Sequence, residues 1–245
     1  MSRLLFGAFA VVSFLFSGTA NAEFYSQLST PFVKTSVNDP VIGPTTAYTS
    51  MNDVSPPTPL FIGEVFDNFR LASAGSVTKI NWVGAYSSKD VGLNPTFEIN
   101  FYQDGVGGLP GSRIGTTLSA VAATETPQTD AGYFLYSANI APVALLGGTN
   151  YWLSIMANIN DAVESWGFAI TDAAVAPSLQ GSAQFTDGTL FKYPSTVGAD
   201  QFPTVDFAFS LEVTTVPEPS SIVLLLTSSI AIFGLRPLRA RKLAA

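Results

Sequence analysis

The feature that most constrains the fold is a period-two alternation of apolar and polar residues, which recurs through the middle of the chain. The segment VDFAFSLEV is typical, because Phe207, Phe209, Leu211 and Val213 alternate with smaller or polar residues. Successive side chains of a strand point to opposite faces, so this pattern predicts a strand with one buried face. No stretch of the body shows a convincing 3.6-residue periodicity. The body is therefore predicted to be all-β.

Several other segments repeat the pattern. The residues predicted to face inward are Ile80, Trp82 and Tyr86 in VTKINWVGAY, and Phe97, Ile99 and Phe101 in PTFEINFYQDG. Glu98 and Asn100 fall on the opposite, polar face of the second segment. The segments GYFLYSANI, NYWLSIMAN and SWGFAITD continue the alternation. Many short strands separated by Gly, Pro, Asn and Asp predict an antiparallel β-sandwich of the jelly-roll kind.

The clearest turn is QFTDGTLF, in which Asp187-Gly188 separates two short β-prone runs. A two-residue Asp-Gly loop matches the twist of the strands that flank it. We therefore predict a hairpin whose loop lies between Phe185-Thr186 and Thr189-Leu190.

The N-terminus has the pattern of a cleaved secretory signal. Arg3 provides a positive charge, Leu4 to Phe16 is apolar, and Ala20 and Ala22 are small residues at the positions that a signal peptidase reads. Residues 1–22 are thus predicted to form a signal helix that is removed, which leaves Glu23 as the first mature residue. The alternative is an uncleaved N-terminal anchor.

The C-terminus has a different pattern. Pro217-Glu218-Pro219 precedes an apolar segment at about 221–235, which is predicted to be a transmembrane helix. This segment is short for a hydrocarbon layer about 30 Å thick, although flanking residues can extend it. Four basic residues follow it, namely Arg236, Arg239, Arg241 and Lys242. Basic residues next to a span stay in the cytoplasm, so the upstream chain is predicted to be outside.

Together, the Pro217-Glu218-Pro219 motif, the apolar segment and the basic tail resemble the PEP-CTERM sorting signal of Gram-negative bacteria. The resemblance covers residues 217–245, with all three parts in the right order. It implies handling by an exosortase, a membrane-embedded cysteine transpeptidase thought to cut near the motif. The tail would hold the exported protein at the inner membrane until the enzyme transfers or releases it. The alternative is a permanent tail anchor.

A second and looser resemblance lies in the body. In order, the segments FDNFRL, INWVGAY, FYQDGVGGLPG, NYWLSI and WGF are similar to the β-sandwich body of many PEP-CTERM proteins. This chain has Phe168 where a second tryptophan is common in those bodies. The resemblance implies the sandwich fold but no ligand.

Between the two signals, residues 23–216 are long enough for one domain with a sizeable core. This body contains all 18 acidic residues except Glu218, but only six of the 11 basic residues, so its net charge is −11. Such a surface repels nucleic acid and anionic lipid. We therefore expect no nucleic-acid partner, whereas cations and neutral glycans remain compatible with this charge.

The chain contains no cysteine and no histidine. These absences exclude a cysteine nucleophile, a Ser-His-Asp triad, a Cys/His zinc site and haem ligation by histidine. A pair of carboxylates acting as a glycosidase remains the one common hydrolase scheme. Glu64, Glu98, Glu125 and Glu164 are candidates by residue type, but nothing in the sequence marks a pair.

Two kinds of binding site use residues that could equally have structural roles. Trp82, Trp152 and Trp166 could form a sugar-stacking platform, although Trp82 and Trp166 share their faces with apolar residues and are expected in the core. Trp152 alternates with Tyr151 and Leu153, so one of these two faces must meet water or another layer, and the sequence does not decide which one. The oxygen donors that could hold a structural Ca²⁺ near strand ends are Asp67-Asn68, Gln103-Asp104, Asn158 and Asn160-Asp161. Turns use the same residue types, and we favour the turn interpretation.

These observations predict an exported, non-catalytic β-sandwich with a structural or adhesive role at the cell surface or in extracellular polymer. No catalytic residue, metal site or cofactor is predicted. The expected partners are the exosortase, the membrane before processing, and extracellular polysaccharide as a further candidate. The alternatives are a glycan-binding or Ca²⁺-stabilised adhesion module, a permanently tail-anchored protein and a glycoside hydrolase.

Overall fold

The computed structural model describes residues 22–28, 37–39, 43–54, 62–88, 93–107, 109–160, 164–171, 182–184, 190–192 and 206–215. All of them belong to one compact unit, Ala22–Val216. Most of the predicted sorting elements lie outside the described residues: Ala20, the Pro217–Pro219 motif, the apolar segment 221–235, and the basic residues Arg236, Arg239, Arg241 and Lys242. Within the described part of the chain, no helix is long and apolar enough to cross a membrane.

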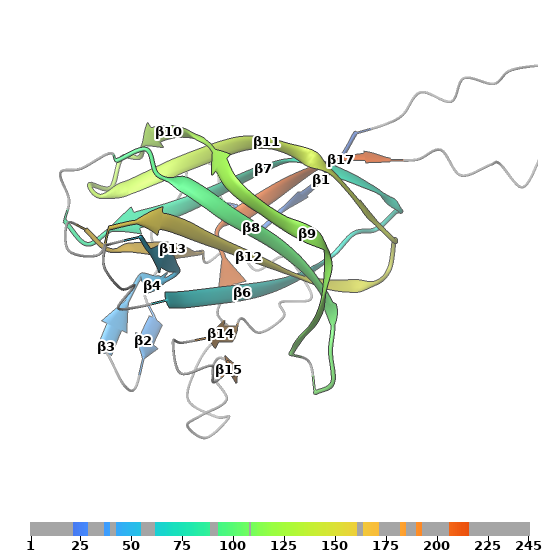
Figure 1. The fold of residues 1–245 in the computed structure, drawn as a ribbon, viewed down its shortest axis with the longest axis horizontal. Coiled ribbons are helices and arrows are strands. Elements are labelled where there is room, and N and C mark those ends of the chain that lie inside the picture. The colour runs from blue at the N-terminus through green and yellow to red at the C-terminus, as the bar shows by residue number, and fades with distance from the viewer. Residues whose placement is uncertain are drawn as a thin grey trace, which may run out of the picture. The chain divides into compact units, whose positions relative to one another are not determined.

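The described residues form strands and connecting segments (Figure 1). The strands are β1 (Ala22–Ser26), β2 (Val37–Asp39), β3 (Gly43–Thr45), β4 (Ala47–Thr49), β5 (Met51–Asp53), β6 (Ile62–Arg70), β7 (Gly75–Tyr86), β8 (Thr96–Asp104), β9 (Pro110–Ala122), β10 (Thr124–Pro127), β11 (Tyr133–Leu145), β12 (Asn150–Ile159), β13 (Trp166–Thr171), β14 (Ser182–Gln184), β15 (Leu190–Lys192), β16 (Asp206–Phe207) and β17 (Phe209–Thr215). The predicted all-β class is confirmed for this part of the chain.

One sheet has eight strands and is organised around β7. Its main order is β1-β17-β7-β11-β10, and β13, β16 and β4 join it through β13. Strands β17 and β13 follow one another along the same side of β7: Phe209 pairs with Trp82, and Phe168 pairs with Gly84. All the pairings in this sheet are antiparallel.

The second sheet has seven strands in the order β15-β14-β6-β5-β12-β8-β9, with an additional pairing of β6 with β12. Its pairings are antiparallel except that of β5 with β12, which is parallel. The chain passes from this sheet to the first one at Ala123, because β9 pairs with β8 whereas β10 pairs with β11. A separate two-stranded sheet consists of β2 and β3.

The two large sheets contribute side chains to one shared core. Trp82 of β7 meets Phe97 of β8 with ring centroids 4.8 Å apart, and Phe69 of β6 meets Phe209 of β17 at 6.1 Å. The predicted inward residues of VTKINWVGAY, PTFEINFYQDG and VDFAFSLEV all belong to this core. Burial of so many aromatic and branched side chains supplies the main driving force for folding.

Two details differ from the sequence predictions. Gln184 pairs with Leu190, so β14 and β15 form a hairpin, but in a register that leaves five residues between the paired strands rather than the predicted two. The loop itself, 185–189, is outside the described residues. Asn100 lies on the face of β8 opposite the shared core, as predicted, but it is only 4% exposed. On the same face, the Phe66 and Tyr102 rings pack 5.3 Å apart.

Candidate functional site

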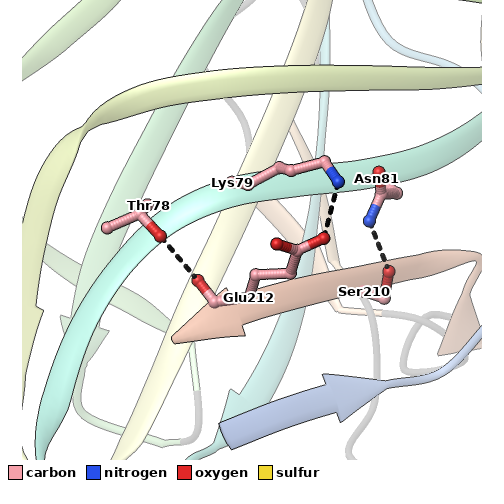
Figure 2. Close-up of polar contacts among 5 residues, drawn as sticks. All are labelled: Thr78, Lys79, Asn81, Ser210 and Glu212. Carbon is pink, nitrogen blue, oxygen red and sulfur yellow. Dashed lines mark hydrogen bonds and ion pairs between the residues drawn. The ribbon is translucent and has the colours of Figure 1, made fainter. Parts of the chain in front are cut away.

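The outer face of β7 and β17 carries a short row of polar contacts, drawn in Figure 2. Lys79 Nζ lies 2.6 Å from Glu212 Oε1, and Asn81 Nδ2 donates to Ser210 Oγ at 3.1 Å. The Lys79 and Glu212 side chains are 32% and 42% exposed. An ion pair this open to water contributes at most about 1 kcal/mol to stability. The row is therefore partly exposed, with Ser210 itself buried, and helps to fix the register of two strands.

The three tryptophans are all buried, so they form no exposed platform. Trp82 and Trp166 lie in the shared core, as predicted. Tyr151 and Leu153 also face this core, which places Trp152 on the opposite face of β12. Trp152 is nevertheless 0% exposed, and its Nε1 donates to Asp104 Oδ1 at 3.0 Å.

The structure does not bring together the oxygen donors considered for Ca²⁺. Asp67 and Asn68 lie inside β6 rather than in a turn, so the turn interpretation is wrong for this pair. They point to opposite faces of the strand, whereas Gln103-Asp104 ends β8 and Asn158 lies near the end of β12. Asp161 is outside the described residues. Within the described part, no group of three or more acidic side chains is placed to hold a metal ion.

The four glutamates considered for hydrolysis have separate environments. Glu125 accepts a hydrogen bond from Tyr86 Oη at 2.8 Å. Glu164 accepts hydrogen bonds from the Ser87 and Ser88 hydroxyls and from the Ser88 N–H. Burial would raise the pKa of Glu164, but these hydrogen bonds outweigh it and the pKa is lowered. Both residues thus act as acceptors that hold neighbouring segments.

Glu64 and Glu98 lie on the outer face of the seven-stranded sheet, on β6 and β8. Burial raises the pKa of Glu64, the hydrogen bond from Tyr102 Oη at 3.0 Å opposes this effect, and the Glu98 charge adds to it. The two carboxylates are therefore close enough to interact, although β12 runs between their strands.

A carboxylate pair that the sequence did not reveal lies on the inner side of the sheets. Asp67 occupies an inward position of β6, between Val65 and Phe69, and all three residues are 0% exposed. Asp206 begins β16 and is 3% exposed. The Phe207 N–H, which belongs to the peptide that joins Asp206 to Phe207, donates to Asp67 Oδ2 at 2.7 Å. The pair therefore links the two large sheets.

Two residues of the N-terminal strand region complete this cluster. The hydrogen-bonding network sets the orientation of the Gln27 amide, whose nitrogen donates to Asp67 Oδ2 at 2.9 Å and to the Phe207 carbonyl at 3.2 Å. The Gln27 amide oxygen accepts a hydrogen bond from Tyr25 Oη at 3.1 Å. We refer to Tyr25, Gln27, Asp67 and Asp206 as the acid cluster.

The acid cluster is electrostatically unusual because its carboxylates are removed from water. Burial raises the pKa of Asp67 well above its usual value, the Asp206 charge raises it further, and the Phe207 N–H opposes both effects. Burial also raises the pKa of Asp206 to about 6. Carboxyl groups with raised pKa values favour folding at low pH, and that contribution is lost as the pH rises through the folded-state values. As the pH rises from about 3.8 to about 6, the contribution of Asp206 to stability is therefore lost, unless a cation compensates the charge.

One sequence signal could have identified half of this cluster. In VFDNFRL, Asp67 occupies the same alternating register as Val65 and Phe69, so a carboxylate stands at an apolar position. No local sequence pattern identifies Asp206, because Asp67, the residue it meets, is distant in the sequence. No protein-family model matches the chain, and no curated protein is significantly similar to it.

Proposed function

We propose that the chain is an exported, non-catalytic protein that an exosortase sorts to the cell surface or extracellular polymer, where its role is structural or adhesive. The body would be a β-sandwich of the jelly-roll kind. Support for this architecture comes from the shared core, to which both large sheets contribute, and from the crossing of the chain between the sheets at Ala123.

The observation that carries the proposal is the pairing of the first and last strands of the body. Ala22 pairs with Thr214 and Glu23 pairs with Val213, so β1 and β17 lie side by side. The two ends of the body therefore lie side by side, one just after the predicted cleavage point at Ala22 and the other just before the motif that begins at Pro217. Removal of both terminal segments would leave every strand of the body in place, apart from the first residue of β1.

Two further observations favour a structural role over the alternatives. Glycan-binding surfaces stack sugars on accessible aromatic rings, whereas all three tryptophans are at most 1% exposed. Hydrolysis would need two carboxylates that reach a substrate, whereas Glu64, Glu125 and Glu164 all accept hydrogen bonds from neighbouring serine and tyrosine side chains. These contacts support a role as a stable module rather than as an enzyme.

The sorting hypothesis predicts a specific effect of the motif. In a host with an exosortase, the triple variant Pro217→Ala, Glu218→Ala, Pro219→Ala should accumulate at full length in the inner membrane and be lost from the surface. The reason is that recognition would need the motif, whereas membrane insertion needs only the apolar span and its basic flank. Cell fractionation and intact mass measure both effects.

The matched control is the double variant Ser220→Ala, Ser221→Ala, which changes the adjoining residues but keeps the motif. It should be sorted like the wild type. If the triple variant has the same location and mass as the wild type, the tail is a permanent anchor and the sorting proposal fails.

A further inference from the structure

Two carboxylate oxygens of the acid cluster lack a partner. Asp67 Oδ1 and Asp206 Oδ1 are buried and accept no hydrogen bond in the described part of the structure. A buried acceptor without a donor is costly, and a buried negative charge is more costly still. We propose that Asp67 and Asp206 together bind a divalent cation, Ca²⁺, through these two oxygens.

The two carboxylates are close enough for a shared cation. Asp67 Oδ2 accepts a hydrogen bond at 2.7 Å from the N–H of Phe207, the residue after Asp206, and the Asp206 charge acts on the Asp67 carboxyl, raising its pKa. The Phe207 and Gln27 N–H groups both bind Oδ2 and thereby hold the carboxylate in place. Oδ1, the other oxygen of the same carboxylate, is left for a ligand.

No described basic side chain neutralises this pair. Apart from Lys192 in β15, whose side chain is outside the described part, the basic residues of the described ranges are engaged elsewhere: Lys79 pairs with Glu212, Arg70 donates to Asn150, and Arg113 donates to Thr117. Two desolvated carboxylates without a positive partner repel one another. A bound divalent cation would remove this repulsion and would supply a partner for both oxygens.

The donor atoms indicate the type of metal. The chain has no cysteine and no histidine, so the soft and imidazole ligands preferred by Zn²⁺ and Cu²⁺ are missing. Carboxylate oxygens suit hard cations, and Ca²⁺ accepts backbone carbonyls in a flexible geometry, whereas Mg²⁺ usually retains several waters. Because Mg²⁺ sheds its waters reluctantly, a buried pair of carboxylates therefore fits Ca²⁺ better.

Such a site would stabilise the contact between the two large sheets. Asp67 comes from the seven-stranded sheet, whereas Asp206 lies in β16, which joins the eight-stranded sheet through β13. A cation held by both would crosslink them, and Ca²⁺ binding to the folded form alone must raise stability. This binding does not require processing of the tail, so it can be tested separately from sorting.

The test is thermal unfolding of the full chain after removal of metal with EDTA, with and without Ca²⁺. At a Ca²⁺ concentration about 100-fold above the dissociation constant, the wild-type melting temperature should rise by roughly 5 °C or more. Asp67→Asn and Asp206→Asn keep the side-chain size and remove a charge, so each should abolish the rise. Asp130→Asn, in an exposed turn, is the matched control and should keep it.

A second measurement uses Tb³⁺ as a luminescent substitute for Ca²⁺. Excitation of nearby aromatic residues, Tyr25 in particular, should sensitise Tb³⁺ emission in the wild type and in Asp130→Asn but not in the two cluster variants. A wild-type melting temperature that does not respond to Ca²⁺ would overturn the proposal. A response that persists in both cluster variants would also overturn it, because the ion would then bind elsewhere.

Discussion

Replacing Gly84 with valine is expected to lower the free energy of unfolding by about 3 kcal/mol or more. Gly84 is buried on the inward side of β7, and the Trp166 indole lies so close that an added Cβ would overlap the ring. The indole cannot move easily, because its Nε1 donates to Tyr136 Oη at 3.2 Å and its ring packs 5.5 Å from Phe97. Urea unfolding of the variant and the wild type measures the loss.

The control for this prediction is Ala144→Val, in the adjacent strand β11. Ala144 is exposed, so the larger side chain should change the free energy of unfolding by less than about 0.5 kcal/mol. Equal losses in the two variants would contradict close packing of Trp166 against Gly84.

A second large effect is expected for Trp82→Ala. Trp82 is 0% exposed, contacts Phe97 edge to face at 4.8 Å and stacks with Tyr136 at 5.5 Å. Removing the indole would leave a cavity where the two sheets meet, and such changes cost about 3–5 kcal/mol. Denaturant unfolding followed by tyrosine and tryptophan fluorescence measures this loss.

Trp82→Phe separates loss of volume from loss of the indole N–H. Trp82 Nε1 has no hydrogen-bond partner among the described residues, so removing it sacrifices no bond. Phenylalanine should therefore retain much more stability than alanine does. If the two variants were equally unstable, cavity formation would not be the cause.

The faces of the central strands could be predicted from the sequence because a single physical rule controls them. Ile80, Trp82 and Tyr86 face the core because alternate positions of a strand share a face. Strand β9 was not predicted, since most of its side chains are exposed at the edge of a sheet and its sequence lacks a clear apolar alternation. The burial of Trp152 on the outer face was also not predictable, because it depends on what covers that face.

The acid cluster shows why the site was harder to predict than the fold. The residue types of Asp67-Asn68 favour a turn, because Asp and Asn are common there, although the register of Asp67 with Val65 and Phe69 places it inside a strand. Its contact with Phe207 joins residues 140 positions apart. Local patterns determine which face a residue occupies, whereas the strand pairing of the whole body determines which residues meet.

The most direct test of the proposed export and sorting is the intact mass of the wild-type protein recovered from a bacterium that carries an exosortase. The account predicts a mature chain that begins at Glu23 and ends near Pro217-Glu218-Pro219, without the apolar segment and the basic tail. A recovered chain that extends to Ala245 would contradict sorting and would identify the tail as an anchor.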